Sequence, residues 1–501
     1  MNRLKDRSID FNSVLMIVNL VVAGLTVFGI QYVSNNDYID KNTIVLALLL
    51  SLQTHIALVL ERRRRDPFII LLASTTIFYF SFRIFTLALY PFSIVFERYS
   101  YGPANSNFAL LFIIVANVFL YAGFFAVRFK GNTTIVSTSW KPISASRILA
   151  LMLVSLIYGY FTAIYWTPDE EPRIVSLIGI FISPQVILLM ALSYLVLFAR
   201  SLSKKAAFTI AALLVLDIIV HTLGGSRSGI ITLAQNVLLV VLAISGAIKI
   251  QRKTLLYACV LAPPVLVLII GSFMLSTFNR AHKDAPGSLG VNQALELAGQ
   301  ARGELGTDTG LDIVLPPIFD RAGFFDYSAE IIAHREQYKD VFRWSSYAKS
   351  IVDNLLTPGF DVYDWPKLSN ALQFVYQDLG VPSKNSVSEL YQSDQFGIYG
   401  EFYAVLGYGS LPLFFFVAFL LKRAYARLKN NSPFIFAMKR LVLLAVFIRI
   451  IDSYGMDWTI IETVPFVVSI FLYTFFFRSK PMSDGETSTR QSKSDPLPNA
   501  V

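Results

Sequence analysis

The sequence predicts an all-α polytopic membrane protein with about 12 transmembrane helices and one large, partly helical outer loop. Two features of composition indicate this fold class: 54% of the 501 residues are hydrophobic, and only 15% are charged. A third is the recurrence of apolar runs long enough to cross about 30 Å of hydrocarbon. The run 255–275, for example, is apolar on all sides. This is typical of a lipid-embedded helix and lacks the alternation of a membrane β-strand.

Positive charge predicts which helix ends face the cytoplasm, because Lys and Arg concentrate in cytoplasmic loops. The net charge is +9, and four consecutive arginines occupy 62–65. With both termini cytoplasmic, about 27 Lys and Arg lie on the cytoplasmic side and about four in the short outer loops. We therefore expect a multi-pass protein of the cell inner (plasma) membrane with both termini cytoplasmic. The first apolar segment is expected to remain as a helix, since it is too long for a removable signal.

The membrane helices follow from these runs and their basic or acidic flanks. The first six are expected at about 11–33, 42–60, 67–90, 107–127 and 148–166, with the sixth ending before Arg200. Helices seven to nine are expected at about 206–223, 230–248 and 254–276, and the last three at about 396–421, 434–452 and 459–477. The chain thus divides into a nine-helix bundle (1–276), an outer, periplasmic cap loop (277–395), three further membrane helices (396–478) and a disordered cytoplasmic tail (479–501).

The outer loop 277–395 is the main polar region of the chain. It carries about 10 Lys and Arg against about 16 Asp and Glu, and it is rich in aromatic residues. The stretches 329–339 and 345–355 have helical patterns. A loop of this length in a compact protein is usually functional or disordered, and its aromatic content argues against disorder. We expect a small folded cap.

The link between the seventh and eighth helices, 224–229, places three glycines and two serines around Arg227. Glycine permits tight turns and close backbone approach, and the arginine fork suits a phosphate or carboxylate. Because an anion here would also meet free amides at the start of the next helix, Gly225, Ser226 and Ser228 are candidate substrate-binding residues. The alternative is a tight hairpin in which Arg227 reaches lipid headgroups.

Two more arginines flank apolar segments of the outer loop, Arg280 just after the ninth helix and Arg321 further on. Taken singly, such residues are more often simple loop charges. Together with Arg227, they form a set of three arginines on one rim of the bundle. Such a set can clamp a pyrophosphate and place positive charge where negative charge develops when it leaves.

The candidate bases are Glu401, His334 and the loop carboxylates. Glu401 lies at the outer end of the tenth helix among glycines and aromatic residues, and an ionisable residue on such a helix is functional or paired by default. The alternative for Glu401 is a salt bridge at the rim. The alternative for His334 is a solvated loop residue.

Other charges fall within membrane helices. Arg83 is one; Asp217 with His221, and Arg449 with Asp452, are spaced to share a helix face, so internal pairing explains them. They would equally serve a transporter. The sequence contains neither a Walker-type loop nor a zinc or Asp-rich metal motif, nucleophile elbow or nucleic-acid module. We expect no cofactor, no metal and no nucleic-acid partner.

Several short elements occur in order in the second half of the chain. They are GGSRSGII at 224–231, Arg280 at the end of the next helix, Arg321 in an R-x-x-F setting, LLTPGF at 355–360, and a glycine-paired returning helix at 397–411. In type, order and spacing they resemble the Wzy-type oligosaccharide repeat-unit polymerases of O-antigen, enterobacterial common antigen and capsule. The first half of the chain matches this family only in being hydrophobic.

The resemblance implies a glycosyltransferase of lipopolysaccharide or other surface polysaccharide biosynthesis that uses no nucleotide sugar. Its donor and acceptor would both be oligosaccharides on undecaprenyl pyrophosphate. Arg227, Arg280 and Arg321 would bind the diphosphates, and Glu401 or a loop carboxylate would take the acceptor proton. Tyr327, Trp365 and Tyr403 would contact sugars. Membrane lipid, a chain-length regulator and a flippase are the expected partners.

Three alternatives remain open from the sequence. An O-antigen ligase would perform the same chemistry on a lipid A acceptor, and in ligases a histidine of the outer loop is proposed to activate the acceptor. The resemblance does not align His334 with that histidine. A flippase or transporter of lipid-linked oligosaccharides would line the membrane interior with charge and often contain internal repeats, whereas the candidates here gather on one rim. An assembly scaffold would leave the cap without a substrate.

Overall fold

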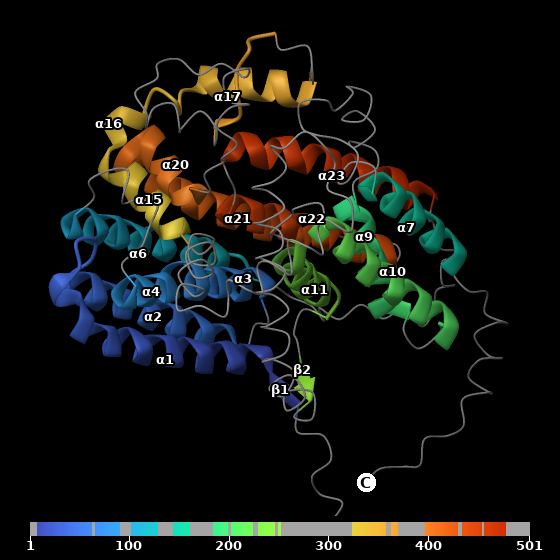
Figure 1. Cartoon of the computed structure of the whole chain (residues 1–501), viewed down its shortest axis with the longest axis horizontal. Coiled ribbons are helices and arrows are strands. Elements are labelled where there is room, and N and C mark those ends of the chain that lie inside the picture. Colours follow the sequence, from blue (N-terminus) through green and yellow to red (C-terminus); the bar gives the residue numbers. More distant parts are fainter. Residues whose placement is uncertain are drawn as a thin grey trace, which may run out of the picture.

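The computed structural model shows a helical protein with a short antiparallel sheet (Figure 1). It describes residues 8–62, 66–90, 102–128, 144–160, 184–198, 202–223, 229–245, 249–251, 323–356, 362–368, 396–428, 433–452 and 455–476. The first helices are α1 (Phe11–Gly29), η1 (Ile30–Asn35), α2 (Lys41–Glu61), α3 (Pro67–Thr75), η2 (Thr76–Ser81), α4 (Phe82–Leu89) and α6 (Pro103–Ala126). They are followed by α7 (Ala145–Tyr160), α9 (Pro184–Phe198), α10 (Lys204–Leu223) and α11 (Gly229–Ser245).

After the undescribed stretch 252–322, the chain resumes with four short helices: α15 (Phe324–Ala333), α16 (Arg335–Tyr338), α17 (Trp344–Ile351) and η4 (Val352–Leu356). The last group is α20 (Gly397–Leu406), η5 (Gly407–Ser410), α21 (Leu411–Arg427), α22 (Pro433–Asp452) and α23 (Met456–Phe476). Among the described residues, a helix therefore lies in each predicted range except the ninth, 254–276, which is outside the described residues.

Five helical segments among the described residues are long and apolar enough to cross a membrane. They are Phe11–Ser34, Lys41–Glu61, Pro67–Leu89, Pro103–Ala126 and Gly397–Arg427. Shorter apolar helices cover Ala145–Gly159, Gln185–Phe198, Gln235–Ile244 and Thr459–Tyr473. By length and composition these are the helices of a membrane protein.

Local chemistry explains where several helices begin. Asp40 precedes α2 and accepts a hydrogen bond from the backbone N–H of Thr43 at 2.9 Å, while the Thr43 hydroxyl accepts one from the Asp40 N–H at 3.1 Å. This reciprocal capping box satisfies free amides of the first turn. Pro67 occupies the first turn of α3, where it needs no N–H partner, and Asp66 caps the N–H of Phe68 at 3.0 Å.

Two expected helices are interrupted. The third contains the π-helical stretch η2 between α3 and α4, which widens the helix where Tyr79 meets Phe324 with ring centroids 4.3 Å apart. The tenth breaks at Gly407, whose φ of +57° favours glycine, so that α20 and α21 are separate helices joined by η5. Neither interruption follows from hydrophobic periodicity, because both depend on packing with other segments.

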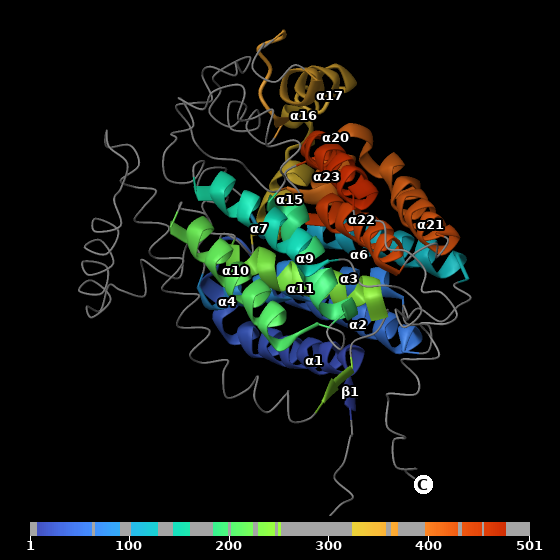
Figure 2. The same ribbon diagram turned by 90° about the vertical axis from the view of Figure 1, so that its right-hand side faces the viewer.

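The helices form three neighbouring groups (Figures 1 and 2). The blue helices α1 to α6 lie on one side, the orange and red helices α20 to α23 on the other, and the green helices α9 to α11 beside them with α7. α21 packs along α6, and the contact is so close that a Cβ at Gly123 would overlap the carbonyl oxygen of Phe415. Small residues allow such close approach of membrane helices.

One end of the bundle, here the Lys422 end, is held by buried charge. The Lys422 ammonium pairs with Asp66 and donates to the carbonyl oxygen of Phe124 at 2.5 Å. Nearby in the chain, Arg440 donates to the carbonyl oxygen of Ala243 at 3.2 Å and lies over the ring of Phe436. These contacts join helix ends that the distribution of Lys and Arg predicted to lie together on the cytoplasmic side.

The small sheet also joins distant parts of the chain. β1 (Ser8–Asp10) pairs with β2 (Lys249–Gln251), with Ile9 opposite Ile250. The first strand leads directly into α1, whose Asn12 donates to the carbonyl oxygen of Leu58 at 3.0 Å. The residues preceding α1 therefore lie beside the segment that follows α11.

The opposite end of the bundle, here the Glu401 end, receives the short helices. α15 packs between α6 and α20. A second hydrophobic cluster includes Ile331, Tyr338, Phe342, Tyr347, Leu368 and Phe396, contributed by α15, α16, α17, the segment 362–368 and the start of α20. The described part of 277–395 is thus packed on the bundle around a small core of its own.

Candidate functional site at the Glu401 end

The structure describes some of the predicted site residues and not others. Arg227, Arg280, Arg321, Gly225, Ser226 and Ser228 lie outside the described residues, so their roles stay predictions. Glu401 and Tyr403 lie on α20, Tyr327 on α15, His334 between α15 and α16, and Trp365 in the segment 362–368. The packing of α15 on α20 brings four of them onto adjoining helices at one end of the bundle.

A buried ion pair fixes α15 in place. Asp326, in its first turn, pairs with Arg83 of α4, and the shortest nitrogen–oxygen distance is 2.5 Å. Both side chains are fully buried. An ion pair removed from water stabilises a structure only with good geometry, and here Nε of Arg83 also donates to Asp326 at 3.1 Å. Arg83 therefore tethers a short helix of the predicted cap to a predicted membrane helix.

Close packing of α20 on α15 adds to the hold of the Arg83–Asp326 ion pair. Gly400 of α20 lies so near α15 that a Cβ there would be 3.2 Å from the Cα of Ser328. The hydroxyl of Ser328 donates to the carbonyl oxygen of Phe396 at 2.9 Å. Further on, Arg335 donates through Nε to the carbonyl oxygens of Tyr403 and Ala404 at 3.1 and 3.2 Å, which satisfies carbonyls at the end of α20.

Glu401 is completely enclosed, with 1% of its surface exposed. The hydroxyl of Tyr347 on α17 donates to its Oε1 at 2.5 Å, and the backbone N–H of Met456 donates to Oε1 and Oε2 at 2.9 and 3.0 Å. Glu401 thus forms no rim salt bridge among these contacts. It links α20, α17 and the first turn of α23, where a carboxylate gains from the helix dipole.

A second buried carboxylate lies beside it. Asp457 accepts hydrogen bonds through Oδ2 from the hydroxyl of Ser350 at 2.6 Å and from the N–H of Leu368 at 3.0 Å. Tyr347 and Ser350 are one helical turn apart on α17, so the same face of α17 reaches both carboxylates. Burial, together with the charge of Glu401, raises the pKa of Tyr347. Its hydroxyl therefore acts as a donor.

His334 lies at the junction of α15 and α16, in a non-helical conformation with φ −111° and ψ 34°. Its Nε2 is 3.8 Å from Oε2 of Glu330, one turn earlier, and the side chains are 30% and 1% exposed. The other oxygen of Glu330 accepts from the hydroxyl of Tyr338 at 3.1 Å. Nε2 of His334 and Oε2 of Glu330 are both buried, and neither has a hydrogen-bond partner among the described residues.

Burial shifts both groups toward their neutral forms. It raises the pKa of Glu330 to about 8, against the smaller opposing effect of the Tyr338 hydroxyl. It also lowers the pKa of His334. A partly exposed imidazole beside a buried carboxyl whose pKa is raised can exchange a proton with a substrate hydroxyl. The sequence contained a signal for this pair, because the Glu-x-x-x-His spacing falls in a stretch expected to be helical.

The three predicted sugar contacts have different surroundings. Tyr403 is buried in an aromatic cluster with Phe112 and Tyr408, at centroid distances of 4.8 and 5.6 Å, so its ring is already occupied. Tyr327 is half-buried in the core. Trp365 is half-buried under Lys349, whose Nζ is 5.0 Å from the ring centroid. The Trp365 indole N–H is buried without a partner among the described residues.

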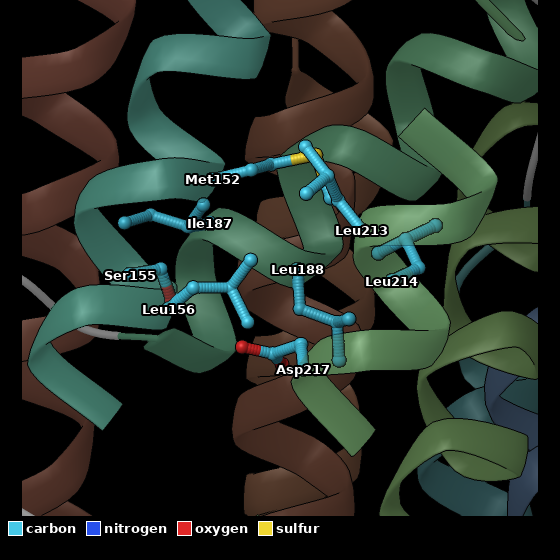
Figure 3. A pocket seen from close by; sticks show the side chains of 8 residues that line it. All are labelled: Met152, Ser155, Leu156, Ile187, Leu188, Leu213, Leu214 and Asp217. Atoms are coloured by element: carbon cyan, nitrogen blue, oxygen red, sulfur yellow. The ribbon is translucent and has the colours of Figure 1, made fainter. Parts of the chain in front are cut away.

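A separate pocket lies between α7, α9 and α10 (Figure 3). Its lining is apolar apart from Ser155 and Asp217, and it includes none of the predicted site residues. Within the part of the chain that the structure describes, no group of three or more His, Cys, Asp or Glu residues is placed to hold a metal ion.

Comparison with known proteins found nothing similar: no protein-family model, no curated protein and no solved structure matches the chain.

Proposed function

We propose that this protein is an integral-membrane glycosyltransferase. It polymerises undecaprenyl-pyrophosphate-linked oligosaccharide repeat units into O-antigen or a related surface polysaccharide at the outer face of the inner membrane. The observation that supports this most is the acid–base pair of Glu330 and His334, held by Arg335 against α20 at the end of a membrane bundle. The ordered arginine elements of the sequence supply the second argument.

The proposed topology has twelve membrane helices and both termini in the cytoplasm. The Lys422 end then faces the cytoplasm, because Lys and Arg accumulate there. The Glu401 end faces outward and carries the folded part of 277–395. Such an arrangement leaves the acid–base pair at the surface where lipid-linked repeat units are available after translocation, and the apolar helices beside it can accommodate a polyprenyl chain.

The reaction joins two lipid-linked substrates. The acceptor hydroxyl oxygen attacks the anomeric carbon of the donor glycan, and a new glycosidic bond forms. The bond between that carbon and the diphosphate oxygen breaks, and undecaprenyl pyrophosphate leaves with the bonding electron pair. The acceptor proton passes to a base. No oxidation state changes.

The chain's residues have distinct roles in this proposal. His334 takes the acceptor proton, since part of its ring is exposed whereas Glu330 is enclosed. Arg227, Arg280 and Arg321 bind the diphosphates and stabilise the leaving charge. Glu401 positions α17, and it reaches a substrate hydroxyl only if the Tyr347 contact opens. Trp365 offers the exposed part of its half-buried ring to the sugars.

The test uses purified protein in nanodiscs with lipid-linked repeat units alone, and the products are separated on a gel. We expect a ladder of chain lengths, its loss in His334→Gln and Arg227→Ala, and its retention in Glu336→Gln, an exposed control on α16. Full polymer length in a folded Arg227→Ala variant would contradict the proposal. Two further assays separate the alternatives. With lipid A added, transfer to lipid A without a ladder would identify a ligase. In vesicles, movement of the intact lipid across the membrane would identify a transporter, and neither activity would indicate a scaffold.

A further inference from the structure

The acid–base pair has one member that cannot reach a substrate. Glu330 is 1% exposed and hydrogen-bonds Tyr338, whereas His334 is 30% exposed and directs its buried Nε2 toward Glu330. Because Nε2 is buried, the exposed part of the imidazole is the part away from Glu330. Substrate can therefore meet His334 and not the carboxyl behind it.

We infer that Glu330 is a positioning residue that holds the imidazole of His334 in the tautomer with hydrogen on Nε2. This leaves Nδ1 free to take the acceptor proton. The inference rests on the proposed function for its reaction, but it gives a positioning role to a residue that the sequence placed only among the candidate bases, as one of the loop carboxylates. Its chemistry is that of a buried carboxylate behind a histidine base, which fixes the ring and stabilises the imidazolium that forms.

The backbone explains why this geometry is stable. α15 ends at Ala333, and the N–H of the next residue, His334, still donates to the carbonyl oxygen of Glu330 at 3.0 Å. The next residue, Arg335, is bound to the last carbonyls of α20. The junction is therefore held from both sides, and the separation of 3.8 Å between Nε2 and Oε2 needs only a small side-chain adjustment to become a hydrogen bond. Such contacts often tighten when substrate binds.

The proton count decides which state is active. When Glu330 is protonated, its O–H can donate to Nε2, which leaves hydrogen on Nδ1 and blocks the base. When Glu330 is ionised, Nε2–H donates to it and Nδ1 accepts. Activity therefore rises as Glu330 loses its proton, and because burial raises the pKa of Glu330 to about 8, the rise is centred near that pH.

Other titratable groups on the elements packed against α15 do not replace Glu330 in this role. They are Tyr79 of η2, Tyr121 of α6, Arg335, Glu336 and Tyr338 of α16, and Tyr399, Glu401 and Tyr403 of α20. Of these, Tyr338 hydrogen-bonds Glu330 in the described structure, and its donated bond opposes the effect of burial. Glu336 points into solvent, with 71% of its side chain exposed.

The test compares the kinetics of Glu330→Gln, Glu330→Asp and the control Glu336→Gln with wild type in the nanodisc assay. We expect Glu330→Gln to lower kcat at least about 10-fold with KM changed less than about twofold, because the interaction matters in the transition state. The acid limb of kcat/KM should move from near pH 8 to a lower pH, because only His334, whose pKa burial lowers, then titrates. Glu330→Asp should retain an acid limb and recover part of the rate.

A double variant separates positioning from a merely structural role. If Glu330 acts through His334, Glu330→Gln combined with His334→Gln is no slower than His334→Gln alone. If a folded Glu330→Gln variant gave a wild-type ladder and an unchanged acid limb of kcat/KM, this inference would be overturned and the proposed function would stand. Absence of a wild-type ladder would overturn both.

Discussion

Arg83 and Asp326 lie 243 positions apart in the sequence and form a fully buried ion pair at 2.5 Å. This pair is a polar tether between the bundle and the short helices that carry Glu330 and His334. Arg83 sits on α4, next to the π-helical stretch whose Tyr79 packs on Phe324 at the start of α15. The irregular third helix therefore meets α15 with both an aromatic and an ionic contact.

Removing one partner of this pair should be strongly destabilising. Asp326→Asn leaves the Arg83 charge buried without its counter-ion, at a cost of about 3–5 kcal/mol. We expect a lower unfolding temperature in detergent. The double change Arg83→Met with Asp326→Leu should recover much of the loss, because an apolar pair leaves no buried charge. Equal unfolding temperatures for Asp326→Asn and wild type would contradict the tether.

The clamp of α17 on Glu401 gives a second prediction. Tyr347→Phe removes the hydroxyl that donates to Oε1 of Glu401, and an incompletely satisfied buried acceptor costs about 1–3 kcal/mol. Protease should then cut α17 faster in the folded protein. The matched control is Ser345→Ala, which removes an exposed hydroxyl from the same helix. Identical cleavage rates in the two variants would show that Tyr347 does not hold α17.

The backbone conformation of Gly397 gives a third prediction. Gly397 has a φ of +59°, and a Cβ there would lie 2.6 Å from the carbonyl oxygen of Ile451. Gly397→Ala should therefore be destabilised by about 1 kcal/mol or more. Gly409→Ala is the control, since a Cβ at that position meets nothing within 4 Å. Comparable unfolding temperatures for the two variants would contradict the close approach of α20 to α22.

The buried carboxyl predicts how stability depends on pH. Folding raises the pKa of Glu330 from 4.5 to about 8, so the folded protein holds more protons than the unfolded chain between these values. Stability from this group is therefore present at low pH and lost as pH rises toward 8. Between pH 5 and pH 8.5 the unfolding temperature of wild type should fall more than that of Glu330→Gln. If the unfolding temperatures of the two proteins fell in parallel, Glu330 would be ionised over this whole pH range and its pKa would not be raised.

Much of the helical architecture follows from the sequence, since long apolar runs and basic flanks mark helices independently of their neighbours. The interruptions do not. Gly407 is recognisable as a glycine, but its positive φ depends on how α20 meets α16 and α21. Likewise, a π-helical stretch at 76–81 cannot be read from a continuous apolar run.

The site divides in the same way. His334 and Glu401 could be selected from residue type and position, and the spacing of Glu330 from His334 is local. The burial that perturbs Glu330, and the partners Tyr347 of Glu401 and Asp326 of Arg83, come from segments 54 and 243 positions away. A single sequence contains no signal for contacts at such separation. Arg449 also pairs between helices at a shorter separation, with Glu462 of α23.

The most direct test of the polymerase proposal is the stoichiometry of lipid release. Purified protein in nanodiscs is incubated with lipid-linked repeat units, and free undecaprenyl pyrophosphate is counted against new glycosidic linkages by mass spectrometry. The proposal predicts one lipid diphosphate released for every linkage formed, and neither product with His334→Gln. Retention of every lipid on its glycan, with no new linkage, would contradict it.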